Sequence, residues 1–272
     1  MGAVDAWAQI TTVRMAEQPW MESLLRWTGQ TGQRLVPDVA KTVAAMDAAD
    51  VDISLLSAWY GPEGCLISNE EVSAAIDEAP TRFRGLATVN LNDPVGAVRD
   101  IRKWVDGERF VGVRIVPWLW DLPPNDRRYY PLYVACVEAG VPFCTQIGHT
   151  GPLRRSEPGR LIPYLEDVLL DFPDLKVVGG HVGFPWIDVV ISIAHKFPNF
   201  YVDTSAYAVH RLPRGLVDFM KAEGKTRVMF GTNWPMLSPG RCLAKLDELG
   251  FDAETRDFFL SGNARRVFNL TG

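Results

Sequence analysis

Residues 176–186, KVVGGHVGFPW, decide the fold of this chain. A short apolar run ends on two glycines and His181, and a turn containing glycine and proline then opens a helical segment. This pattern predicts that His181 lies where a buried strand emerges into a loop. In α/β barrels, such strand ends carry the active site.

Two other segments have the same pattern. Residues 141–151, VPFCTQIGHTG, end on His149, and residues 227–236, RVMFGTNWPM, place Asn233 after a Gly-Thr pair. Because parallel strands in a barrel end at one face, these three polar side chains are expected at a common mouth.

Strand-like and helix-like patterns alternate along the whole chain. About eight strand–helix pairs predict an α/β fold, a distorted TIM (β/α)8 barrel that forms a single domain over residues 1–272. Polar, irregular residues 11–36 are expected to form an inserted loop or lid. The predicted strands are 3–10, 51–58, 84–89, 110–116, 141–147, 176–179, 200–203 and 227–231, and the predicted helices are 37–48, 68–79, 93–105, 129–139, 160–171, 186–196 and 215–222.

Composition excludes several classes of partner. The net charge of -5 comes from no acidic or basic block, which argues against nucleic acid and against an anionic membrane surface. No apolar run approaches the roughly 20 residues that span a bilayer. The four cysteines lie far apart, and the N-terminus lacks the layout of a signal peptide, so a cytoplasmic location is expected.

The residues that follow the strands suggest a pocket for a flat organic molecule. Indoles with a few polar groups suit a small aromatic or conjugated carboxylate, which Arg114 could hold. Arg114 could instead form an ion pair inside the barrel, and any single tryptophan could simply pack under a loop. The candidate substrate-binding residues are Trp7, Gln9, Arg114, Trp118, Trp120, Tyr207, His210, Asn233 and Trp234.

The order of seven motifs resembles the amidohydrolase-2 family, the TIM-barrel hydrolases and decarboxylases related to aminocarboxymuconate semialdehyde decarboxylase. The motifs are VDAWAQ, FVGVRI, IGHTG, GGHVGFPW, NFYVDTSAY, FGTNWPM and SGNARRVF. The resemblance implies one divalent metal, held by two histidines of the first strand, the histidine matching His149 and an aspartate of the eighth strand. It implies an acid/base or ligand role for His181.

This chain departs from the family pattern at the metal ligands. Trp7 and Gln9 stand where the family has the two first-strand histidines, and Asn233 stands where it has the aspartate. An indole cannot ligate zinc, and neutral amides are poor ligands for it. We therefore expect no cofactor, or at most a weakly held divalent metal such as zinc on His149 and His181.

Three functions are consistent with these residues. The first expectation is a metal-independent hydrolase of a small aromatic or conjugated carboxylate, ester or lactone, with His181, His149 and Asp203 as catalytic residues. The second is a decarboxylase or other carbon–carbon lyase, and the third is a ligand-binding barrel without activity. The expected partner is a small-molecule substrate, and family members suggest a homodimer.

Overall fold

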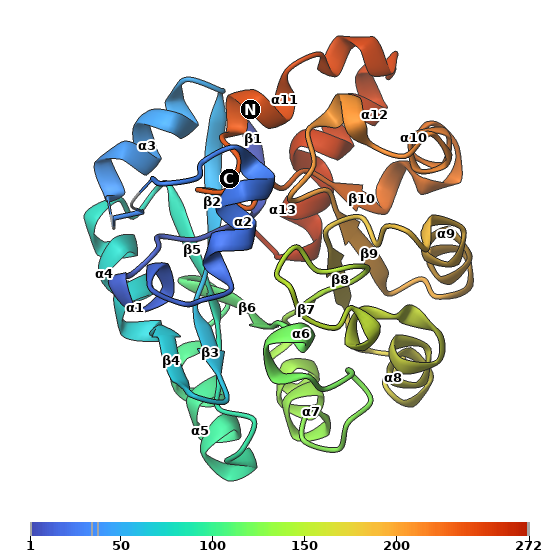
Figure 1. Cartoon of the computed structure of the whole chain (residues 1–272). Coiled ribbons are helices and arrows are strands. Elements are labelled where there is room, and N and C mark those ends of the chain that lie inside the picture. Colours follow the sequence, from blue (N-terminus) through green and yellow to red (C-terminus); the bar gives the residue numbers. More distant parts are fainter. Residues whose placement is uncertain (1, 34, 37, 271–272) are drawn as a thin grey trace.

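The computed structural model describes residues 2–33, 35–36 and 38–270. At its centre, eight parallel strands follow one another around a nearly closed barrel, in the order β1-β2-β5-β6-β7-β8-β9-β10 (Figure 1). A bridge between Ala8 and Trp234 brings the last strand back to the first. The predicted TIM-barrel fold is therefore confirmed. The strands are β1 (Ala3–Ala8), β2 (Val51–Ser57), β5 (Phe83–Ala87), β6 (Phe110–Ile115), β7 (Phe143–Gln146), β8 (Val177–Gly180), β9 (Phe200–Asp203) and β10 (Val228–Met229).

Helices surround the barrel, and all but α8 begin and end within two residues of the predicted bounds (Figure 1). Ser68 and Glu71 form a capping box before α4, and Gly140 ends α7 in the left-handed conformation with φ 68°. The predicted start at Pro37 lies outside the described residues, and Asp38 caps α3. The surrounding helices are α3 (Val39–Asp47), α4 (Asn69–Glu78), α5 (Pro94–Trp104), α7 (Tyr130–Ala139), α8 (Glu166–Asp171), α9 (Ile187–Lys196) and α10 (Arg214–Lys221).

Short elements differ from the prediction. The segment 11–36 was expected to be irregular, yet it contains helices α1 (Val13–Ala16) and α2 (Met21–Thr28). A hairpin of β3 (Trp59–Gly61) and β4 (Gly64–Ile67) was not predicted, nor was α6 (Pro117–Trp120). These elements are too short to show a clear hydrophobic period.

The predicted helix 160–171 is not continuous. Residues Leu161–Leu165 form a wide turn in which Ile162 has non-helical φ and ψ, and only Glu166–Asp171 is α-helical. Pro163 accounts for the break, since proline disfavours the helical conformation of the residue before it.

The C-terminal tail covers the N-terminal ends of the strands. Helix α13 (Asn263–Val267) follows α12 (Ala253–Asp257), and Arg265 forms an ion pair with Asp52 at the start of β2. Lys176, just before β8, donates to the backbone carbonyl of Val267. The mouth at the opposite end of the barrel is therefore free for chemistry. Among the described helices, none is long and apolar enough to cross a membrane.

Candidate functional site

His181, Trp7 and Arg114 lie in contact at the mouth of the barrel. The ring centroids of Trp7 and His181 are 4.4 Å apart, and the guanidinium carbon of Arg114 lies 3.8 Å from the centroid of the Trp7 ring. Trp7 and Arg114 are fully buried, and His181 is partly buried. The end of β1, the interior of β6 and the residue after β8 thus meet in one centre.

A hydrogen-bonded chain runs from His181 through Ser205 to Asp203. The Nδ1 atom of His181 lies 2.6 Å from the Ser205 hydroxyl, which donates in turn to Oδ1 of Asp203. The backbone N–H of Ser205 donates to the same oxygen at 3.0 Å. Because the hydroxyl proton points to the carboxylate, Ser205 accepts from Nδ1–H. In the neutral ring, Nε2 is then the free acceptor.

Local electrostatics keep His181 uncharged. Burial, followed by the positive charges of Arg114 and of His149 when it is protonated, lowers the pKa of His181 to about 3. The imidazole retains some exposure, but its contacts with an indole and a guanidinium favour the neutral form. Burial raises the pKa of Asp203, and Arg114, whose Nη2 lies 3.7 Å from Oδ2 of Asp203, opposes that rise.

Arg114 is anchored beneath the mouth. Its guanidinium donates to the Ser57 hydroxyl at 2.7 Å and to the carbonyl of Ala6 at 3.1 Å, and it faces Asp203. The ion pair that was considered as an alternative for Arg114 is therefore present. Its role as a clamp for a substrate carboxylate stays a prediction.

Asp5 joins the first strand to the loop after the last one. Its Oδ1 accepts from the backbone N–H groups of Trp7 and Thr232, and its Oδ2 accepts from the Thr232 hydroxyl at 2.6 Å. Burial raises the pKa of Asp5 to about 7. These bonds help to close the barrel directly beside the site.

Gln9 and Asn233 form an amide network at two of the positions where the resemblance implied metal ligands. Oε1 of Gln9 accepts from the Trp7 indole at 3.1 Å, and Nε2 donates to Oδ1 of Asn233 at 3.0 Å and to the carbonyl of Trp234. Asn233 and His181 have φ values of 66° and 71°. Such left-handed conformations are costly for residues other than glycine, and they concentrate at functional sites.

Tryptophans cover the mouth but pack against one another. Trp20 stacks on Trp59 with centroids 6.3 Å apart, meets the edge of Trp118 at 5.1 Å, and is buried. Trp120, buried in the same helix as Trp118, stacks on Tyr60. Trp20 was not among the predicted site residues, although its presence in the suspected lid was a clue.

The remaining predicted residues lie further out. The ring of His149 is 5.7 Å from that of Phe184, His210 is exposed, and Tyr207 is partly buried, which raises its pKa to about 12. The indole of Trp234 donates to Thr42 at 3.0 Å. The positions of these four residues do not test whether they act in catalysis or in substrate binding. Each of these roles stays a prediction.

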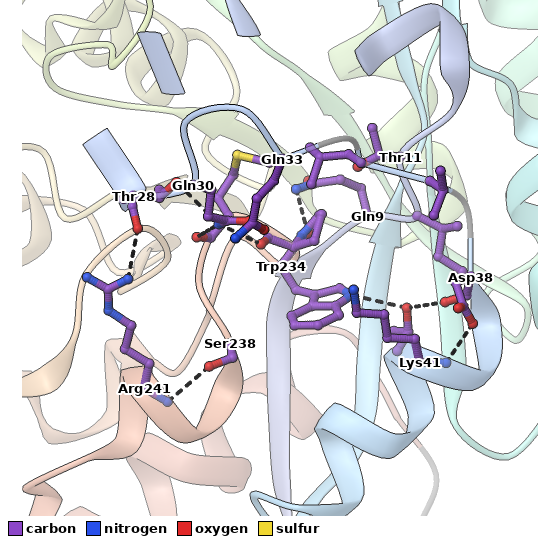
Figure 2. A pocket seen from close by; sticks show the side chains of 17 residues that line it. Gln9, Thr11, Thr28, Gln30, Gln33, Asp38, Lys41, Trp234, Ser238 and Arg241 are labelled. Atoms are coloured by element: carbon purple, nitrogen blue, oxygen red, sulfur yellow. Dashed lines mark hydrogen bonds between the residues drawn. The ribbon is translucent and has the colours of Figure 1, made fainter. Parts of the chain in front are cut away.

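A cavity of about 330 Å³ lies beside this centre, on the outer side of Gln9 and Trp234 (Figure 2). The first turn of α3, residues of the 11–36 segment and α11 (Pro239–Leu243) complete its walls. His149, His181 and Asp203 are not among its lining residues.

His181 follows β8, the sixth strand of the parallel barrel, and is linked through Ser205 to Asp203 of β9, the seventh strand. This arrangement is that of an amidohydrolase-type α/β barrel. The amidohydrolase family profile matches residues 4–270, and the chain belongs to that family. It is similar to gamma-resorcylate decarboxylase of Rhodococcus jostii (strain RHA1), with 24% identity over 255 residues, 75% of each chain.

Solved structures show the same fold. An uncharacterized TIM-barrel protein from Bordetella bronchiseptica has a TM-score of 0.84 at 23% identity over 99% of each chain. A dihydroxybenzoic acid decarboxylase from Polaromonas sp. JS666, with bound manganese and 2-nitroresorcinol, has a TM-score of 0.74 at 19% identity, covering 99% of this chain and 97% of that one.

These findings correct two expectations. A metal-independent hydrolase was the first expectation, but the named relatives are decarboxylases, which favours the alternative. The expectation of no cofactor, or at most a weakly held metal such as zinc, is also wrong for this class, because a solved relative carries manganese. Sequence reasoning failed here because it took the reaction and cofactor from three substituted positions.

The donor set of this chain differs from the set that the resemblance implied. Within the described residues, no group of three or more histidine, cysteine, aspartate or glutamate side chains could hold a metal ion. The amides of Gln9 and Asn233 are bonded to each other, and the Arg114 cation lies against Trp7. These residues do not fit a complete divalent-metal site of that kind.

Proposed function

We propose that this protein is a decarboxylase of a small hydroxylated aromatic carboxylic acid. The relatives named for gamma-resorcylate, 5-carboxyvanillate and dihydroxybenzoic acid support this substrate class. The observation that carries the proposal is the hydrogen-bonded chain from His181 through Ser205 to Asp203, which holds the imidazole against the Trp7 indole.

The reaction replaces a carbon–carboxylate bond by a carbon–hydrogen bond. In our proposal, Nε2 of His181 takes the proton of a phenolic hydroxyl, and the imidazolium delivers it to the ring carbon that bears the carboxylate. The bond to the carboxylate then breaks, carbon dioxide leaves, and the electron pair restores the aromatic ring. One proton from solvent, taken up by the phenolate oxygen, completes each turnover.

The lowered pKa of His181 suits the second step, proton delivery to the ring carbon, and makes the first step, removal of the phenolic proton, the demanding one. The imidazole is unprotonated at neutral pH and can accept a proton, while the imidazolium that forms is a strong acid. Ser205 and Asp203 hold the His181 ring in one orientation and one tautomer. The ion pair between Arg114 and Asp203 lies next to this chain. Trp7 contributes a flat surface against the imidazole.

Added manganese belongs in the assay because a relative binds it. Within the described residues, no set of side chains fits a complete site for that ion, and Nε2 of His181 is assigned to proton transfer in this proposal. The assay is therefore run with and without added manganese.

The experiment incubates the protein with 2,6-dihydroxybenzoate and 5-carboxyvanillate and follows loss of the acid and gain of the decarboxylated phenol by NMR. We expect turnover by the wild type, none by His181→Asn, and full activity in His195→Asn, which changes an exposed histidine of helix α9. Tight binding of both acids with no product would contradict the proposal and favour a non-catalytic ligand-binding barrel.

A further inference from the structure

The cavity beside Gln9 and Trp234 has the composition of a binding site that is separate from the His181 centre. Its volume of about 330 Å³ falls within the roughly 300–1,000 Å³ typical of small-molecule pockets. Figure 2 shows Arg241 and Lys41 on opposite sides of Trp234, with Gln33 above them. Its lining comes from four separate segments of the chain.

Positive charge dominates this cavity. Lys41 and Arg241 line it, and neither forms an ion pair within the described part of the chain. Nη1 of Arg241 donates to the carbonyl of Thr28 at 3.0 Å, which holds the guanidinium at the wall. The single acidic residue of the lining, Asp38, is engaged as the N-cap of α3, where it accepts from the backbone of Lys41 at 2.7 Å.

The start of α3 contributes Asp38, Lys41 and Thr42 to the lining. Because the Asp38 carboxylate already occupies the N-terminus of this helix, the positive charge available to a ligand comes from Lys41 and Arg241.

The rest of the lining is apolar. Trp234, whose indole is held by Thr42, forms part of the wall together with Ile10, Leu35 and Met236. A hydrated inorganic ion would make little use of these surfaces, whereas an organic anion would cover them. We propose that this cavity binds a small organic carboxylate, with its charged group attracted by Lys41 and Arg241, which lie on either side of Trp234, and its apolar body against Trp234.

The probe for the test is cyclohexanecarboxylate, which has no aromatic ring and cannot follow the proposed decarboxylation. Its binding is measured by isothermal titration calorimetry to the full chain, with cyclohexanecarboxamide as the neutral counterpart and inorganic phosphate as the second anion. Failure here would leave the decarboxylase proposal standing, and failure of decarboxylation would leave this site standing.

We expect the carboxylate to bind and the amide to bind at least about tenfold more weakly, since a charge-assisted hydrogen bond is worth about 1.5–3 kcal/mol. Arg241→Gln and Lys41→Gln should each weaken binding by about the same factor. Arg214→Gln, which removes an exposed arginine outside the cavity, should leave it unchanged.

Three results would overturn the assignment. The first is no binding of the carboxylate by the wild type. The second is equal binding of the carboxylate by wild type, Arg241→Gln and Lys41→Gln. The third is phosphate binding that depends on Arg241 without carboxylate binding, which would show a simple phosphate site. Because Lys41 and Arg241 are exposed, both variants should fold, and their melting temperatures verify this.

Discussion

His181 combines a left-handed backbone, an indole contact and a hydrogen bond to Ser205 in one residue. Its lowered pKa also affects stability. The unfolded chain binds a proton near pH 6.5, whereas the folded chain does so only near pH 3. As pH falls through this interval, the unfolded state holds more protons, and the free energy of unfolding decreases.

We therefore predict that the wild type loses more stability between pH 7.5 and pH 5 than His181→Asn does, as measured by urea denaturation. Asp5 and Asp203, whose pKa values are raised, act in the opposite direction in both proteins and cancel in the difference. His210→Asn serves as the control for losing a histidine elsewhere. Equal losses in wild type and His181→Asn would contradict this account of His181.

Ser205 is a positioning residue, because it acts through His181. We predict that Ser205→Ala lowers kcat on the order of tenfold or more and leaves KM nearly unchanged, since the tautomer of His181 is no longer fixed. Ser205→Thr should restore much of the rate. Thr204→Val, which removes a buried hydroxyl without a partner in the described residues, should have full activity. A rate loss in Ser205→Thr as large as in Ser205→Ala would contradict this role.

Thr232 gives a test of barrel closure. Its hydroxyl donates to Asp5 and accepts from the backbone N–H of Trp234 at 2.9 Å. Thr232→Val leaves these buried groups unsatisfied and should lower the free energy of unfolding by about 1–3 kcal/mol. Thr145→Val removes a buried hydroxyl with no partner among the described residues, so it should be neutral or stabilising. Chemical denaturation of both variants measures the difference.

At the scale of elements, the segment holding α1 and α2 covers the tryptophans at the mouth. Trp20 is buried against Trp59 and Trp118, while Thr12 ties the segment to β4 through the carbonyl of Leu66. The role of this segment as a lid over His181 stays a prediction.

We predict that Trp20→Ala loosens this segment and leaves the barrel intact. Hydrogen exchange should accelerate in residues 13–28 and stay as in the wild type in β7 and β8, because Trp20 packs at the mouth and outside the strands. Trp27→Ala, which removes a largely exposed indole from the same helix, is the matched control. Faster exchange throughout the barrel would show that Trp20 is a core residue and not part of a cover.

The sequence predicted the elements with a strong period or a clear end. The capping box at Ser68 and the glycine at Gly140 placed two helix ends correctly. The hairpin β3–β4 and helix α2 were missed, because such short elements are set by tertiary contacts such as those of Trp20. Pro163 interrupted a helix whose apolar spacing looked continuous.

The candidate site was only partly predictable. Glycines beside His181 and His149 marked two strand ends, but no local pattern shows that Ser205 bonds to His181, 24 residues away in the chain. The contact of Trp7 with Arg114 joins residues from β1 and β6, and it depends on the closed barrel. The cavity of Lys41 and Arg241 likewise needs four segments to meet.

At the scale of the whole molecule, the packed C-terminal tail and the candidate site lie at opposite ends of the barrel. The tail with α13 packs at the N-terminal ends of the strands, while the polar and strained residues gather at the other end. Family membership and the fold place this chain among barrels whose named relatives decarboxylate aromatic acids.

The most direct test uses 2,6-dihydroxybenzoate labelled with carbon-13 in its carboxylate, in deuterated water with added manganese. We predict release of labelled carbon dioxide and one deuterium on the ring carbon that lost the carboxylate, both abolished in His181→Asn. Recovery of the labelled acid unchanged, or release that proceeds equally in His181→Asn, would contradict a decarboxylase in which His181 carries the proton.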